Sequence, residues 1–211
     1  MSTPGFPAGT LDSVGTPIWI SALAEEQPHH TVHVVRGLEP TEALELLGAK
    51  PRLFQRCMIP RDRPETWRSA PAEDTFTMLA GRIGDWTFVY DAEGATSFDA
   101  DSSPTTVPAK KLSADGRVAA TSTVTFTMKT DLGYAVDGEV VVHVINGGLP
   151  YVETELPAEL QAAIDAAGTF EPSYEDQADT SVYLRVLAAL ADLRCTTDDL
   201  RHISLVATPF G

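Results

Sequence analysis

The chain has 211 residues, of which 43% are hydrophobic and 21% are charged, values typical of a globular domain with a buried core. Fifteen basic and thirty acidic residues give a formal net charge of −15. Because this charge repels nucleic-acid phosphates and anionic lipid surfaces, it argues against nucleic-acid binding and favours a basic protein partner.

The cellular compartment is predicted from features that the sequence lacks. The N-terminal residues contain neither a basic start nor the apolar segment of a secretory signal. No stretch approaches the roughly 20 apolar residues that cross a membrane. Cys57 and Cys195 lie far apart and match no zinc-ligand spacing. We therefore expect a cytoplasmic protein without a membrane span, in which both thiols are reduced and buried.

The N-terminal region is predicted to begin with a flexible or loosely docked arm. Residues 1–16 are rich in proline, glycine, serine and threonine, which favour irregular structure. One folded domain is expected to occupy residues 17–211. Its first elements are two short β-type runs, "PIWISAL" at 17–23 and "TVHVVRG" at 31–37.

The clearest helix signal lies at 37–49, where Pro40 suits the first helical position and Gly48 suits the position after the last turn. The following segment, 50–72, is rich in proline and arginine, and its prolines argue against regular structure. We expect this segment to be a long excursion from the domain.

Strand patterns dominate the middle of the chain, where apolar and polar residues alternate between turn signals such as Gly-Asp and Asp-Gly. These patterns predict strands at 75–80, 86–91, 117–130, 133–138 and 139–146. The last three strands are expected to form an antiparallel meander. The polar, turn-rich segment at 99–116 is predicted to be a loop.

The C-terminal third is predicted to be mostly helical, with helices near 157–167 and 178–194, a short capped helix in "TTDDLRH" and a last strand in "ISLVATPF". An apolar stripe on the second helix is expected to pack on the sheet through Val182, Val186, Leu190 and Leu193. The element order predicts an α+β fold, with a mostly antiparallel sheet of six or seven strands and three or four helices packed against it.

The stretch "GDWTFVYDAEG" at 84–94 places carboxylates after an aromatic-rich strand. Asp91 and Glu93 could be a pair of catalytic carboxylates, which must be held about 5–9 Å apart around a substrate. The favoured interpretation is a strand that runs into a turn, because Gly94 suits a left-handed conformation and the aromatic residues alternate onto one face.

Histidines offer a second candidate site. His29 and His33 share one face of a predicted strand, and His143 lies in another strand. Together with nearby carboxylates they could bind a metal ion, and a small metal-dependent hydrolase is therefore one alternative function. Their spacing matches no established ligand motif, so solvated or hydrogen-bonded histidines are the favoured interpretation.

Five segments carry a family resemblance, and they occur in the order "TVHVVRGLEPTEALELLGA", "GDWTFVYDAEG", "VTFTMKTDLGYAVDGEVVVHV", "SVYLRVLAALADL" and "TTDDLRHISLVATP". In this order they resemble a domain family of unknown function that is abundant in actinomycetes. The resemblance covers roughly residues 17–210 and implies a shared fold without catalytic residues. The chain departs from the family pattern at Glu39, where a hydroxyl-bearing helix cap is usual, and at 50–72, which is expanded.

No motif in the sequence indicates catalysis. A nucleophile elbow, a Ser-x-x-Lys pair, a phosphate-binding loop and a dinucleotide fingerprint are all missing. We therefore expect no catalytic residues and no cofactor, and we favour a non-enzymatic protein-binding domain. An immunity or antitoxin-like protein that neutralises a basic partner would need such an acidic surface. A ligand-sensing or scaffold domain is an alternative that the sequence does not separate from this function.

The partner-binding surface is predicted in the acidic C-terminal third. Residues 151–211 contain 11 acidic and 3 basic residues, and "EPSYEDQAD" at 171–179 sets one aromatic ring among carboxylates. The ring would supply contact area, while the carboxylates would attract the partner. The predicted partner-binding residues are Glu171, Tyr174, Glu175, Asp176 and Asp179. The alternatives are a solvated loop between helices, or an interface in the 50–72 excursion.

Overall fold

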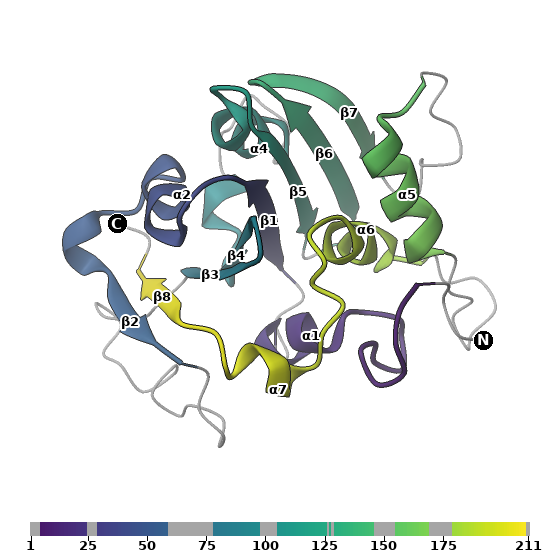
Figure 1. Ribbon diagram of the computed structural model, residues 1–211, viewed down its shortest axis with the longest axis horizontal. Helices are drawn as coiled ribbons and strands as arrows, with labels where there is room; N and C mark the ends of the chain where they lie inside the picture. Colours follow the sequence, from purple (N-terminus) through teal and green to yellow (C-terminus); the bar gives the residue numbers. More distant parts are fainter. Residues whose placement is uncertain are drawn as a thin grey trace.

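Eight strands form one antiparallel sheet in the order β2-β8-β3-β4-β1-β5-β6-β7 (Figure 1). They are β1 (His30–Arg36), β2 (Gln55–Cys57), β3 (Met78–Ile83), β4 (Trp86–Asp91), β5 (Val118–Val124), β6 (Thr130–Val136), β7 (Glu139–Ile145) and β8 (Leu205–Thr208). The computed structural model describes residues 5–24, 29–58, 78–97, 105–125, 127, 129–145, 155–168 and 179–209. The sheet and its helices confirm the predicted α+β class.

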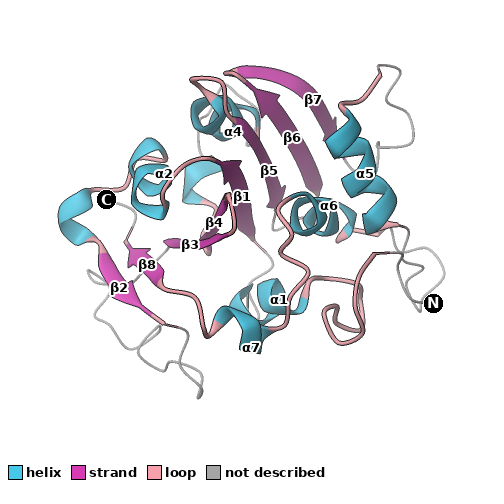
Figure 2. Cartoon of the chain, viewed as in Figure 1, coloured by secondary structure: helices cyan, strands magenta, loops and turns pink. Residues whose placement is uncertain are grey.

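Helices cover both faces of the sheet, as Figure 2 shows in cyan against magenta strands. They are α1 (Ile18–Ala24), α2 (Pro40–Leu46), α4 (Thr106–Ser113), α5 (Ala158–Ala167), α6 (Val182–Leu190) and α7 (Thr197–Leu200), with short 3-10 helices η1 (Pro51–Leu53) and η2 (Ala95–Ser97). Helices α2 and α4 pack on one face, called here the α4 face, and the other four pack on the α6 face. No described helix is long and apolar enough to cross a membrane.

Two hydrophobic clusters form the core because successive strand side chains point to opposite faces. The α4 face contributes Val35, Val89 and Ala119 to one cluster, together with Leu44 of α2 and Leu112 of α4. The larger cluster on the α6 face includes Val34, Phe88 and Ala120, together with Trp19 of α1 and Leu187 of α6. All six residues of β4 are buried, since helices cover the sheet on both sides.

Most of the predicted elements are confirmed. Strands β1, β3, β4, β7 and β8 form where the alternating patterns lie, and α2, α5 and α7 form within the predicted helical segments. Gly48 and Gly168 follow their helices with φ of 102° and 58°, as expected of terminating glycines. Strand β2 is an eighth strand, and it lies within the segment 50–72, which was predicted to be irregular. Residues 59–72 of this segment lie outside the described part.

The predicted strand at 17–23 is wrong, because Ile18–Ala24 form helix α1. The carbonyl of Pro17 accepts a hydrogen bond from the N–H of Ile20 at 2.9 Å, which closes the first turn. The side chains of Trp19 and Ile20 are buried against the α6 face. A short apolar run has too few residues for its periodicity to separate a helix from a buried strand, so tertiary packing decides.

The predicted loop at 99–116 is also wrong in its second half, where Thr106–Ser113 form helix α4. Pro108 lies in the first turn, where a missing N–H costs no intrahelical hydrogen bond. Ala109 and Leu112 are completely buried against the α4 face. The proline and the polar composition concealed this helix, which is stabilised by the few apolar side chains it buries.

The predicted strand at 117–130 contains a hairpin, since β5 ends at Val124 and β6 begins at Thr130. Gly133 is therefore an interior residue of β6. A Cβ atom at Gly133 would lie 2.9 Å from the carbonyl oxygen of Thr105, so the close approach of α4's N-terminal end requires glycine.

The N-terminal segment packs against the domain from Gly5 onward. Phe6 is buried, and the carbonyl of Gly5 accepts a hydrogen bond from the guanidinium of Arg194 at 2.9 Å. A Cβ atom at Gly5 would lie 2.9 Å from the Cβ of Ala166, so the backbones are in contact. The arm predicted at 1–16 is thus docked along its described part, which begins at residue 5.

Helix α6 is shorter than the predicted helix at 178–194, and it is buried around most of its circumference. It packs against α5 and also against β1, β5 and β6. Its buried apolar residues are Tyr183, Leu184, Val186, Leu187 and Ala188. Of the predicted stripe, Val186 and Leu193 are buried, whereas Val182 and Leu190 are only partly buried.

The burial of α6 predicts different costs for two leucine truncations. Leu187 is 1% exposed, so Leu187→Ala should lower the free energy of unfolding by about 2–5 kcal/mol through lost burial and the cavity that remains. Leu190→Ala should cost less, because Leu190 is partly exposed. Urea denaturation of both variants measures the difference, and equal costs would contradict the observed orientation of α6.

Candidate functional site

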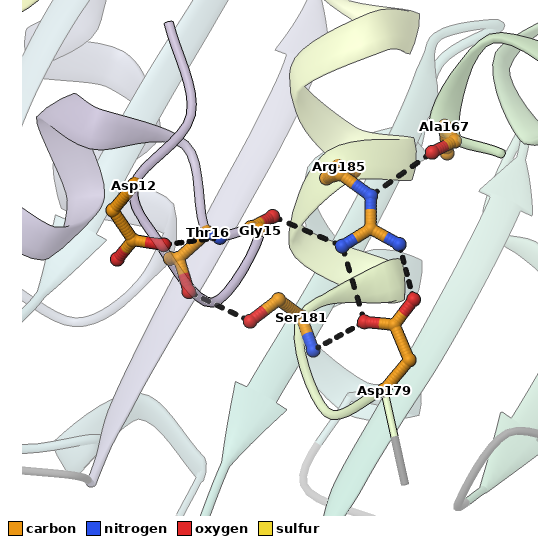
Figure 3. Close-up of polar contacts among 7 residues, drawn as sticks. All are labelled: Asp12, Gly15, Thr16, Ala167, Asp179, Ser181 and Arg185. Carbon is orange, nitrogen blue, oxygen red and sulfur yellow. Dashed lines mark hydrogen bonds and ion pairs between the residues drawn. The ribbon is translucent and has the colours of Figure 1, made fainter. Parts of the chain in front are cut away.

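The guanidinium of Arg185 on α6 is completely buried, with a side-chain exposure of 0%. Its Nε–H donates to the carbonyl of Ala167 at 2.9 Å, and Nη1 donates to the carbonyl of Gly15 at 2.9 Å. Asp179 receives hydrogen bonds from both Nη1 and Nη2 (Figure 3). The bidentate carboxylate and the two carbonyls satisfy the charge and the N–H groups of the guanidinium, whose burial would otherwise be very costly.

The same guanidinium binds one residue on each side of the acidic segment. Ala167 is the last residue of α5, and Asp179 lies just before α6. Because both residues bind Arg185, Ala167 and Asp179 lie close together in the fold.

The N-terminal segment joins the same cluster from the opposite side of the guanidinium (Figure 3). The hydroxyl oxygens of Thr16 and Ser181 lie 2.6 Å apart, and the N–H of Ser181 donates to Asp179 at 3.3 Å. Asp12 accepts the N–H of Thr16 at 2.9 Å, which closes the turn that presents Gly15. Three segments that are distant in sequence thus meet at one buried cation. We call their contacting residues the Arg185 cluster: Asp12, Gly15, Thr16, Ala167, Asp179, Ser181 and Arg185.

Of the five predicted partner-binding residues, Asp179 belongs to the Arg185 cluster, while Glu171, Tyr174, Glu175 and Asp176 lie outside the described residues. Asp179 is largely buried, and its carboxylate is engaged by Arg185, so its structural role is to anchor the segment. The predicted role of all five in partner binding stays a prediction.

Arg185 is not among the predicted site residues, although the sequence carries a signal for it. Arg185 is the only charged residue between Asp179 and Asp192, and it stands within the apolar run "VYLRVLAAL". A lone charge in a helix that is apolar on all sides indicates either a buried pair or a functional group. Its carbonyl partners, however, could not be identified from sequence, because they depend on how the N-terminal segment and α5 dock.

Removing the carboxylate from the Arg185 cluster should destabilise the fold strongly. Asp179→Asn leaves a buried guanidinium without its counter-charge, which typically costs about 3–5 kcal/mol. Asp192→Asn is the matched control, because Asp192 pairs with Arg194 at an exposed site, where such pairs contribute about 1 kcal/mol or less. Chemical denaturation compares the two variants. Equal, small losses would contradict the anchoring role of Asp179.

A second polar cluster lies on the α4 face around His33, which is completely buried in β1. Its Nε2 lies 2.9 Å from the hydroxyl of Thr96, and its Nδ1 lies 2.9 Å from the hydroxyl of Thr121 on β5. The Thr96 hydroxyl donates to Asp91 at 2.7 Å. Asp91, Thr96, His33 and Thr121 therefore form a continuous hydrogen-bonded chain inside the protein.

This chain determines the protonation of the imidazole. The single hydroxyl hydrogen of Thr96 is donated to Asp91, so the Thr96 oxygen must accept a hydrogen from Nε2 of His33. In the neutral ring Nδ1 then accepts from Thr121. Burial lowers the pKa of His33 to about 3, which keeps the ring neutral at physiological pH.

Asp91 stabilises the turn that follows β4. Its carboxylate accepts hydrogen bonds from the N–H of Thr96 at 2.8 Å and the N–H of Glu93 at 3.2 Å. Burial raises the pKa of Asp91, and these hydrogen bonds oppose the rise. Gly94 has a φ of 60°, in agreement with the predicted turn. Glu93 is exposed while Asp91 is completely buried, so the two carboxylates do not share one cleft.

The structure separates the histidines proposed as metal ligands. His33 and His143 share the α4 face, but two strands lie between them, and three strand spacings correspond to about 14 Å. His29 packs against Gly94, and His143 lies 3.6 Å from a carboxylate oxygen of Asp131. Within the described part of the chain, no three histidine, cysteine or acidic side chains are placed to hold a metal ion.

The cysteines are unpaired and lie apart from both clusters. Cys57 is on β2 and Cys195 precedes α7, and each is partly buried. Burial raises the pKa of the Cys57 thiol, and burial together with the nearby carboxylate of Asp199 raises the pKa of Cys195 to about 11. Both thiols are therefore protonated and weakly nucleophilic at physiological pH.

Comparison with known protein families, with curated proteins and with solved structures finds no match to this chain. The resemblance to an actinomycete domain family therefore stays a prediction that rests on the quoted segments alone.

The buried imidazole predicts a specific loss of stability in acid. Below pH 6.5 the unfolded chain protonates His33 while the folded chain does not, so stability falls as the pH decreases, by up to about 1.4 kcal/mol per pH unit. The raised pKa of Asp91 makes the free energy of unfolding rise as the pH decreases. This contribution is present in every variant that keeps Asp91, so it does not affect the comparison.

This loss can be measured with two histidine variants. His33→Gln should have a flatter dependence of unfolding free energy on pH than the wild type between pH 5 and 6.5, by about 2 kcal/mol over the interval. His202→Gln, at an exposed position, should keep the wild-type slope. Identical slopes for the wild type and His33→Gln would mean that His33 is protonated in the folded state.

Proposed function

We propose that this protein is an acidic, non-enzymatic protein-binding domain whose partner is a basic protein, in the manner of immunity and antitoxin proteins. The observation that supports the proposal is that Arg185 binds Ala167 and Asp179, the described residues on either side of the acidic stretch 171–178. Fixing the flanks of a binding segment lowers the entropy that it loses on binding.

The charge distribution supports a basic partner. The net charge is −15, and residues 151–211 alone contain 11 acidic and 3 basic residues. A field of this sign steers basic proteins toward the surface and raises association rates by about 10- to 1,000-fold at low ionic strength. The proposal includes a cytoplasmic location, which rests on the sequence features described above.

The internal hydrogen bonding favours binding over catalysis. His33 and Asp91 have acid–base potential, but His33 is committed to threonine hydroxyls and Asp91 to the Thr96 hydroxyl and backbone N–H groups. Each is completely buried. A general acid or base must reach a substrate proton, and these side chains reach only one another. The metal-dependent hydrolase therefore has no supporting observation among the described residues.

The proposal is tested by affinity capture followed by kinetics. The immobilised protein is exposed at low salt to an extract of the cells that produce it, and proteins eluted by salt are identified and purified. We expect a partner rich in lysine and arginine. Replacement of Glu171, Glu175 and Asp176 by their amides should slow its association about tenfold and flatten the salt dependence. Tyr174→Ala should speed dissociation instead.

A matched variant controls for the change in total charge. The same three-charge change at the exposed residues Glu45, Glu93 and Asp115 should alter association much less. Asp179 is left unchanged in both variants, because its replacement would disturb the Arg185 cluster. Equal slowing by the two triple variants, or a captured partner without excess positive charge, would contradict the proposal.

A further inference from the structure

Two turns that contain the dipeptide Asp-Gly lie against each other at one end of the sheet. The sequence contains this dipeptide at 115–116 and at 137–138. The first lies between α4 and β5, and the second joins β6 to β7. The N–H of Asp137 donates to the carbonyl of Arg117 at 2.9 Å, so the two turns are in direct contact although they are distant in sequence.

Both turns require residues that tolerate a left-handed backbone. Asp115 and Asp137 have φ of 60° and 50°, and the glycines that follow them have φ of 78° and 75°. Aspartate is one of the few residues other than glycine that adopt this conformation readily. Two successive positive φ values are also what a tight two-residue hairpin such as 137–138 needs. The backbone therefore explains why this dipeptide occurs at both places.

The dipeptide Asp-Gly is chemically reactive, because glycine has no side chain to hinder attack by its amide nitrogen. That nitrogen attacks the side-chain carboxyl carbon of the aspartate. A new N–C bond forms, the bond from this carbon to its hydroxyl breaks, and the hydroxyl leaves as water with the amide proton. Water then opens the five-membered ring. Opening at the backbone carbonyl leaves isoaspartate, in which the main chain runs through Cβ, and opening at the other carbonyl restores aspartate.

The attacking nitrogen of the first dipeptide is held by the second turn. The N–H of Gly116 donates to the carboxylate of Asp137 at 2.7 Å. This nitrogen must lose its proton to attack, and a carboxylate at hydrogen-bonding distance opposes the loss, because like charges would then face each other. A hydrogen bond to an ionised acceptor is also stronger than one between neutral groups. The contact therefore suppresses the reaction at Asp115.

The other surroundings of Asp115 leave it open to this reaction. Its side chain is 84% exposed and Gly116 is exposed, so water reaches both groups. Its carboxylate pairs with Arg117 at 3.0 Å, and exposed ion pairs of this kind restrain a side chain only weakly. The nitrogen of the second dipeptide differs, because the N–H of Gly138 donates to the neutral hydroxyl of Ser113 at 3.1 Å. Protection by a charged acceptor is thus particular to the first dipeptide.

We propose that Asp115 is a site of isoaspartate formation that Asp137 protects in the folded protein. The modification needs no reactant other than water, and it is independent of the proposed function. It would insert one extra backbone carbon between α4 and β5, where the N–H of Arg117 donates to the carbonyl of Ser113 at 3.1 Å. The hydrogen bond between the two turns therefore preserves the connection on which the packing of α4 depends.

Isomerisation at this site can be followed with one tryptic peptide. Trypsin cleaves after Lys111 and Arg117 and so releases residues 112–117, which contain Asp115. The two forms of this peptide have the same mass but separate by chromatography. The folded protein and a synthetic peptide of the same residues are incubated together in warm, mildly acidic buffer. We expect the folded protein to form isoaspartate at least about tenfold more slowly, as the strength of a charged hydrogen bond implies.

Three variants separate the role of Asp137 from other effects. Asp137→Gly removes the carboxylate but permits the same positive φ, and it should speed isoaspartate formation at residue 115 at least about tenfold. Asp192→Gly makes the same change of charge at another exposed position with a φ of 53°, and it should keep the wild-type rate. Ser113→Ala frees the N–H of Gly138 without freeing that of Gly116, so it should also keep this rate.

Each remaining outcome would overturn the proposed protection. Equal rates in the folded wild type and the synthetic peptide would show that the fold does not protect Asp115, and this comparison needs no variant. An unchanged rate in Asp137→Gly would show that its carboxylate is not the protecting group. Equal acceleration by Asp137→Gly and Ser113→Ala would assign the protection to the general packing of the turns. Thermal unfolding of every variant verifies that it is folded at the temperature of incubation.

Discussion

The buried guanidinium of Arg185 is the constraint on which the arrangement of the α6 face depends. A cation in a dry interior is tolerated only when its hydrogen-bonding groups and its charge are matched, and the matching groups come from three separate segments. Gly15 positions the N-terminal segment, Ala167 the end of α5, and Asp179 the chain that enters α6. The geometry of one side chain thus determines where α5, α6 and the N-terminal segment lie relative to one another.

On the α4 face, buried polar side chains of β1 and β5 are satisfied by hydrogen bonds between neutral groups. The α4 face of β1 and β5 carries Thr31, His33, Thr121 and Thr123 in its interior, and their side chains hydrogen-bond across the strands. Each pair satisfies groups that the covering helix α4 excludes from water. The two faces therefore differ in how they satisfy buried polar groups: the α4 face uses a neutral imidazole and threonine hydroxyls, whereas the α6 face uses a carboxylate–guanidinium pair.

These buried networks restrict where function can reside in the described part of the chain. The side chains of His33, Asp91 and Arg185 are engaged in internal hydrogen bonds, and both faces of the central strands are covered. The acidic sequence 171–179, whose flanking residues Ala167 and Asp179 bind Arg185, carries carboxylates that would attract a basic partner.

The sequence by itself determined the α+β class, the meander from β5 to β7, and helices α2, α5 and α7, because periodicity, caps and turn residues are local signals. It also indicated that Asp91 and Gly94 belong to a turn. Tertiary structure decided the rest. The run at 17–23 forms a helix because its side chains Trp19 and Ile20 pack on the sheet. Helix α4 forms because its own Leu112 is buried against the sheet. The Arg185 cluster could not be predicted, because it brings together residues whose proximity depends on helix docking rather than on spacing along the chain.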